Sequence, residues 1–181
     1  MFLMSLLLTM STLASAEGAV VRTQVPKLVV NILIDQLRTD YMEAFIPLYS
    51  EDGFKRLLNE GRIYEQASYP HALPDLASAT ATIATGTSPC DHGIIGKSWI
   101  DRSSLRPIFC CDDINYPGIG TNDASSPKHM RVTTLTDELK IATEGKSIVY
   151  AISPFREVAI FSAGHAADGA VWIDDNTGEW V

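Results

Sequence analysis

Asp35 stands at a position in this sequence where a carboxylate can bind a metal ion. It directly follows residues 27–34 (KLVVNILI), an apolar and β-branched run that predicts a strand buried on both faces of a parallel sheet. The carboxyl ends of such strands are where α/β proteins bind their ligands. Asp35 is therefore a candidate ligand of a divalent metal. The alternative is a solvent-facing aspartate that caps the next segment.

Ser78 is the candidate nucleophile. Residues 77–85 are rich in small side chains and follow Pro74 and Asp75, which predicts a helix whose amino end is free to interact. Free N–H groups and the helix dipole at that end activate a hydroxyl and stabilise charge on a phosphoryl group. The alternative is that Ser78 or Thr80 only caps the helix.

The sequence contains four histidines that could bind a metal or act in catalysis: His71, His92, His129 and His165. No pair has the His-x-x-x-His spacing of a local metal site. His92 and His165 each adjoin a glycine in a predicted tight turn, so we expect structural roles for both.

Several elements must position these residues. Residues 53–61 and 134–143 are predicted helices, the second with a capping box from Thr134 to Asp137. Residues 147–153 predict a strand, and residues 170–174 and 178–181 predict a hairpin. The chain ends inside that hairpin, so we expect it to be the amino-terminal part of a longer protein, truncated at the C-terminus.

Composition and charge narrow the functional class. The chain is 46% apolar and 20% charged, as in globular proteins, with a net charge of −8 and a pI near 4.9. This acidity argues against a nucleic-acid polymer as a partner but leaves room for a small phosphate-ester substrate.

The first residues indicate export. Residues 1–16 resemble a secretory signal peptide, residues 17–26 form a polar lead-in, and residues 27–181 form the folded part. The alternative is a membrane anchor, but the apolar run is shorter than the about 20 residues that a bilayer needs. We therefore expect a periplasmic protein with no stable membrane span after cleavage. In that oxidising compartment Cys90 could pair with Cys110 or Cys111.

Five motifs occur in order along the chain: residues 34–41 (IDQLRTDY), 53–61 (GFKRLLNEG), 85–94 (TGTSPCDHGI), 133–139 (TTLTDEL) and 163–165 (AGH). Together they resemble the alkaline phosphatase superfamily. The most similar branch is that of zinc-dependent alkaline phosphatases and type I phosphodiesterases/nucleotide pyrophosphatases. The resemblance implies an α/β fold, a mostly parallel sheet with helices on both faces. It also implies phosphate-ester hydrolysis through a Ser or Thr nucleophile and two zinc ions, with Asp35 as the first zinc ligand.

The sequence departs from the family where phosphate would bind. The nucleophile position falls on Ala77 or Ser78, and Lys97 replaces an asparagine that would donate to a phosphate oxygen. Phe155 and Glu157 replace a Lys and an Arg that clamp the phosphate. A carboxylate there repels a phosphate dianion. Lys97 and Arg156 are the residues that could compensate.

Two functions remain as hypotheses. One is a periplasmic metal-dependent hydrolase of phosphate mono- or diesters, with this fragment inactive because the remaining zinc ligands of the family lie downstream. The other is a degenerate phosphatase-like scaffold that serves binding or envelope assembly.

Overall fold

A computed structural model describes residues 26–69, 71–72 and 75–181. The predicted signal peptide and most of the polar lead-in lie outside these residues. The chain divides into two units, Met1–Tyr64 and Glu65–Val181. Within the described ranges no helix is long and apolar enough to cross a membrane.

The described part of the first unit has short helices after residue 38 and has no buried residue. Its elements are α1 (Thr39–Phe45), the 3-10 helix η1 (Ile46–Leu48) and α2 (Phe54–Glu60). The predicted helix at 53–61 is thus confirmed, beginning after Gly53 and ending at Gly61.

The strand predicted at 27–34 is wrong for this structure. These residues form no helix or strand, and all are exposed, with Leu28 at 78% and Ile32 at 73%. A strand needs a neighbour for its N–H and C=O groups. The apolar sequence of residues 27–34 suits a buried strand, but no neighbouring strand pairs with this segment among the described residues.

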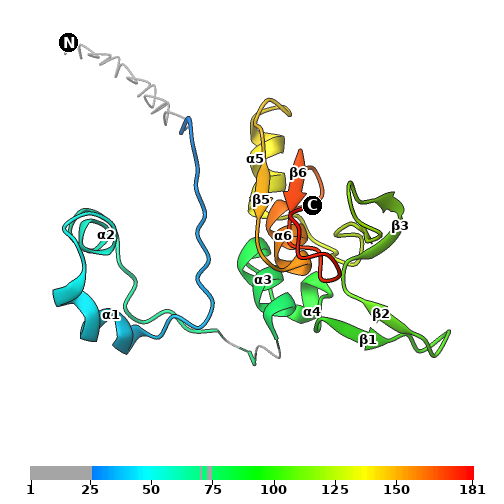
Figure 1. Cartoon of the computed structure of the whole chain (residues 1–181), viewed down its shortest axis with the longest axis horizontal. Coiled ribbons are helices and arrows are strands. Elements are labelled where there is room, and N and C mark those ends of the chain that lie inside the picture. The colour runs from blue at the N-terminus through cyan, green and yellow to red at the C-terminus, as the bar shows by residue number, and fades with distance from the viewer. Residues whose placement is uncertain (1–25, 70, 73–74) are drawn as a thin grey trace, which may run out of the picture. The chain divides into compact units, whose positions relative to one another are not determined.

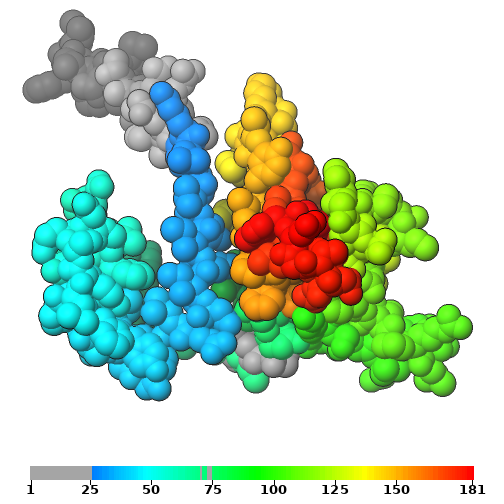
Figure 2. All heavy atoms as spheres, in the orientation of Figure 1, coloured from blue at the N-terminus to red at the C-terminus, as the bar shows by residue number. Residues whose placement is uncertain are grey.

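The second unit contains the core. Helix α3 packs against α6 through alanines, which let the two backbones approach closely, and Phe161 and Trp172 fill the centre. Figure 1 shows the β1–β2 hairpin extending away from these helices, and Figure 2 shows the C-terminal segment at the surface of the unit. The elements are α3 (Leu76–Thr85), α4 (Pro89–His92), β1 (Ser98–Ile100), β2 (Pro107–Phe109), β3 (Asp112–Pro117), β4 (Ala124–Ser125), α5 (Leu135–Ala142), β5 (Tyr150–Ile152), α6 (Arg156–Ala163) and β6 (Gly169–Val171).

The α/β class predicted from the sequence is confirmed. Strands β5 and β6 pair in parallel, with α6 as the crossover, and β1–β2 and β3–β4 are antiparallel pairs. Gly169 allows the close approach of β5, because a Cβ there would lie 2.7 Å from the Tyr150 ring. Among the described residues the strands form three separate two-stranded sheets, so the mostly parallel sheet predicted from the sequence is present here as the β5–β6 pair.

Local predictions in this unit also hold. Thr134 and Asp137 form the capping box of α5. The C-terminal hairpin closes through Trp172 and Val181, whose N–H groups donate to each other's carbonyls at 3.0 and 2.9 Å.

Candidate functional site

The start of α3 is fixed by Asp75, which the sequence placed directly before the helix but gave no role in the site. Its Oδ1 accepts a hydrogen bond from the Ser78 N–H at 3.0 Å, as an N-cap does, and its Oδ2 accepts from the Lys97 N–H. One carboxylate therefore joins the first turn of the helix to a segment 22 residues away. An aspartate directly before a run of helix formers is the local signal that identifies such a cap.

Ser78 lies in this first turn with its side chain directed inward. It is fully buried, and its Oγ donates to the Asp75 carbonyl at 3.3 Å. Ala77, the alternative nucleophile position, is also fully buried. For Ser78 to attack a substrate, its hydroxyl must leave that carbonyl and reach the surface.

The structure brings the two predicted substrate-binding residues to one aromatic ring. The Arg156 guanidinium lies 4.3 Å from the centre of the Phe109 ring, and the Lys97 ammonium lies 5.6 Å from it. Both are cation–π distances. Residues 59 positions apart in sequence (156 minus 97) thus form one cluster, which we call the Phe109 cluster: Lys97, Phe109 and Arg156.

Both cations of the Phe109 cluster already form ion pairs with acidic residues. Lys97 Nζ lies 3.2 Å from Glu157 Oε1, and the Glu157 side chain is only 4% exposed. Arg156 contacts Asp112 at 2.7 Å and Asp123 at 2.9 Å. Two cations therefore face three carboxylates, which makes the surroundings of the cluster net negative. Asp112 and Asp123 carry no local sequence signal for this role, because their contact with Arg156 is purely tertiary.

Asp35 belongs to the first unit. It is exposed, stands in a turn, and accepts a hydrogen bond from its neighbour Gln36 at 3.2 Å. Over the described ranges, no three His, Cys, Asp or Glu side chains gather as a metal site would require. Zinc needs three or four such ligands. The described residues by themselves therefore do not make up a zinc site, because Asp35 is a single candidate ligand.

His92 is a buried part of the fold. Its Nδ1 accepts from the Ile94 N–H at 3.1 Å, which leaves Nε2 protonated to donate to Thr82 Oγ1 at 3.1 Å. Burial lowers the pKa of His92 and the nearby His71 lowers it further, although Asp91 opposes this. A neutral ring with both nitrogens engaged agrees with the structural role expected from sequence.

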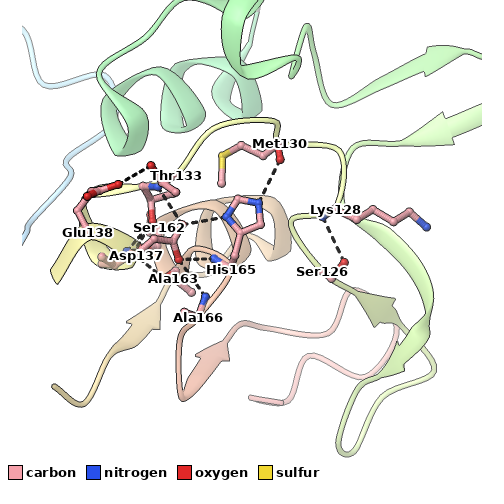
Figure 3. A network of polar contacts seen from close by, with 12 residues as sticks. Ser126, Lys128, Met130, Thr133, Asp137, Glu138, Ser162, Ala163, His165 and Ala166 are labelled. Atoms are coloured by element: carbon pink, nitrogen blue, oxygen red, sulfur yellow. Dashed lines mark hydrogen bonds and ion pairs between the residues drawn. The ribbon is translucent and has the colours of Figure 1, made fainter. Parts of the chain in front are cut away.

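His165 joins three segments of the second unit (Figure 3). Its Nδ1 lies 2.8 Å from Asp137 Oδ2, and its Nε2 lies 3.1 Å from the Met130 carbonyl. Burial raises the pKa of Asp137, but hydrogen bonds from His165, Thr134 and Ala166 outweigh it and hold that pKa below its usual value. The ring connects α5 to the loop after α6, which is again a structural role.

The three cysteines are free thiols in this structure, so the considered pairing of Cys90 is not present. Cys90 is exposed, whereas Cys110 and Cys111 are fully buried. A hydrogen bond with Cys111, together with burial, raises the pKa of the Cys110 thiol. The two buried thiols pack in the core as small apolar residues.

Comparison with known proteins decides the family. A sequence model of the type I phosphodiesterase / nucleotide pyrophosphatase family matches residues 29–178, which is most of the chain. The chain belongs to this family. The match includes Asp35, Ser78 and the whole Phe109 cluster.

Relatives of the chain in this family include named phosphatases. The chain is 41% identical over 159 residues to alkaline phosphatase PhoV of Synechococcus elongatus and 38% identical over 159 residues to a protein of Myroides odoratus named calcium-transporting ATPase. It is 36% identical over 160 residues to alkaline phosphatase PafA of Elizabethkingia meningoseptica. Each alignment covers 86% of this chain and 29% of the relative. The chain thus spans about 29% of the length of the relatives it matches.

A solved structure supports the same fold. The crystal structure of wild-type alkaline phosphatase PafA matches with a TM-score of 0.76 and 35% identity. The match covers 81% of this chain and 29% of that chain. The type I phosphodiesterase family and the alkaline phosphatase fold therefore both apply to this chain.

Proposed function

We propose that the protein to which this chain belongs hydrolyses phosphate esters. The family match across residues 29–178 is the observation that carries this proposal. In this proposal, the start of α3 and the Phe109 cluster are the part of the substrate-binding site that this chain contributes. The chain by itself is expected to be inactive, since it lacks a complete metal site among its described residues.

The charges around the Phe109 cluster favour a substrate with a single negative charge. Each cation is already paired, and the buried Glu157 carries a charge that repels phosphate oxygens. A phosphate monoester is a dianion at neutral pH, whereas a diester or sulfate ester is a monoanion. The proposed substrate is therefore a phosphodiester, with a sulfate ester as the chemically related case.

Ser78 and Asp35 have proposed roles in this reaction. Ser78 would act as the nucleophile after its hydroxyl leaves the Asp75 carbonyl. Asp35 would supply one carboxylate to a metal ion, which we propose to be zinc, and the other ligands would come from outside the described residues. Zinc held by Asp35 and those further ligands would supply the Lewis acidity of a two-metal hydrolase.

The decisive experiment uses the protein extended past Val181. Hydrolysis of bis(4-nitrophenyl) phosphate is compared with that of 4-nitrophenyl phosphate, together with zinc per chain. We expect about two zinc ions per chain and a preference for the diester. Glu157→Gln should shift the ratio of kcat/KM values towards the monoester by roughly tenfold, since one nearby charge is removed.

Two control variants sharpen this experiment. Glu144→Gln removes an exposed carboxylate that pairs with Lys146 and should leave the ratio unchanged. Ser78→Ala should abolish turnover without releasing zinc. Equal kcat/KM ratios in Glu157→Gln and the wild type would contradict the charge argument, and an active Ser78→Ala would remove Ser78 as nucleophile.

The proposed location is the bacterial periplasm, reached through the signal peptide at residues 1–16. Amino-terminal sequencing of the protein recovered from the periplasmic fraction should give Glu17 as the first residue. A protein that keeps its first 16 residues in the cell envelope would instead indicate an anchor.

A second candidate function is a binding scaffold without catalysis. The buried Ser78 hydroxyl and the double pairing of Arg156 favour it, because both would have to change before a substrate could react. A folded extended protein that binds no zinc when the metal is supplied, and turns over neither ester, would decide for the scaffold.

A further inference from the structure

A pocket in the second unit lies apart from the candidate functional site. It has a volume of about 440 Å³ and lies between α4, β1 and the loop before α5. Neither Ser78 nor Asp75 lines it, and no residue of the Phe109 cluster does. The lining residues that matter to the argument are Cys90, Gly93, Trp99, Lys128, His129 and Arg131.

Positive charge gathers in this pocket although the chain as a whole is acidic. Lys128 and Arg131 line it, and no Asp or Glu does. Lys128 is partly neutralised by Asp113 at 3.4 Å, and its side chain extends away from the Asp137–His165 network in Figure 3. Arg131 has no ion-pair partner within the described part of the chain. Its guanidinium is therefore available to an anion.

Gly93 gives Arg131 its place in the pocket. A Cβ at Gly93 would lie 3.1 Å from Arg131 Nε and 3.2 Å from Arg131 Cδ, so the arginine side chain occupies the space that any other residue would fill. Gly93 also has a φ of +82°, which favours glycine. The Arg131 N–H donates to the His92 carbonyl at 3.0 Å, which fixes the backbone beneath the side chain.

An aromatic wall faces these cations. Trp99 and His129 meet edge to face, with ring centroids 5.5 Å apart and an interplanar angle of 82°. Burial lowers the pKa of His129, and Lys128 lowers it further against the opposing effect of Asp113 and Asp112. The neutral imidazole leaves Lys128 and Arg131 as the charged groups of the lining. Aromatic faces of this kind accept a stacked ring.

We infer that this pocket binds a small aromatic anion, whose ring stacks against Trp99 and whose acidic group pairs with Arg131 and Lys128. A volume of about 440 Å³ suits a single substituted ring. This inference does not depend on the proposed hydrolase, because none of its residues belongs to the candidate functional site.

Cys90 provides a built-in reporter for the test. It lines the pocket and is exposed, while Cys110 and Cys111 are fully buried. Its thiolate attacks the disulfide of dithiobis(2-nitrobenzoate), which forms a mixed disulfide on Cys90 and releases one coloured aryl thiolate. This reagent is itself an aromatic anion, and dithiodipyridine is a neutral reagent of similar shape. The ratio of the anionic to the neutral labelling rate therefore reports the electrostatic potential at the Cys90 thiol.

The experiment compares the full chain with two arginine variants. Arg131→Gln should lower the ratio of anionic to neutral labelling rates by roughly fourfold or more, as expected for losing one charge near the thiol. Arg102→Gln removes an exposed arginine between β1 and β2 that does not line the pocket, and should leave the ratio unchanged. An unchanged neutral rate in both variants shows that the pocket has kept its shape.

Protection by a probe completes the test. Benzoate should slow labelling of the wild type by dithiodipyridine in a saturable way, and should do so less in Arg131→Gln. Cyclohexanecarboxylate, which has the charge but no aromatic ring, should protect more weakly. If benzoate gives no saturable protection, or if Arg131→Gln leaves the rate ratio unchanged, the inference is wrong.

Discussion

The ammonium of Lys97 lies 3.2 Å from the carboxylate of Glu157, which is buried while the lysine is half exposed. Lys97 and Glu157 stand at two of the positions where the sequence resemblance predicts a departure from the family, and the structure shows that these two side chains contact each other. Lys97 compensates the charge of the buried Glu157 carboxylate, so the presence of one residue explains the presence of the other.

Removing the lysine should therefore destabilise the fold. Lys97→Met keeps a side chain of similar length but leaves Glu157 buried without its partner. We expect a loss of about 1–3 kcal/mol in the free energy of unfolding, measured by urea denaturation. Lys97→Met combined with Glu157→Gln should recover part of it. The matched control, Lys146→Met, breaks an exposed pair with Glu144 and should change stability by less than about 0.5 kcal/mol.

Asp75 should contribute to stability through both of its oxygens. Asp75→Ala removes the helix cap and the acceptor of the Lys97 N–H, at a cost of about 1–3 kcal/mol. Asp75→Asn keeps one acceptor oxygen and should cost less. Asp175→Ala, in the exposed C-terminal turn, is the control. Equal unfolding midpoints for Asp75→Ala and this control would mean that the cap is unimportant.

Stability should fall with acid partly through Asp137. Its pKa in the folded state lies below that of the unfolded chain, where the reference value is 3.8. The stabilisation is therefore present above about pH 4–5 and is lost as pH falls through the folded pKa. The free energy of unfolding, measured with urea at several pH values from 6 to 2.5, should fall less steeply with pH in Asp137→Asn than in the wild type. Parallel curves would contradict this prediction.

The three thiols should differ sharply in reactivity. A neutral thiol reagent should label one cysteine, Cys90, in the native chain and all three in urea without a reductant. Cys90→Ser should remove the fast reaction and leave two thiols titratable in urea. Finding only one thiol in urea would instead indicate a disulfide.

The sequence by itself determined the local features of this protein. The capping box of Thr134 and Asp137 and the hairpin around residues 175–178 follow from neighbouring residues, since their hydrogen bonds span only a few positions. The family could also be inferred from motifs in order, because these motifs are contiguous stretches of sequence. The bounds of the predicted helices at 53–61, 77–85 and 134–143 agree to within two residues for the same reason, whereas α1, α4 and α6 were not predicted.

Only the tertiary structure decided which of these features meet. Arg156 contacts Asp112 across 44 positions, and His165 contacts Asp137 across 28, with nothing local to predict either pair. Apolar residues at 27–34 suggested a buried strand, yet they remain exposed because a strand forms only where another strand accepts its backbone hydrogen bonds. Local sequence sets what a segment can form, and the packing of distant segments sets which of those forms is populated.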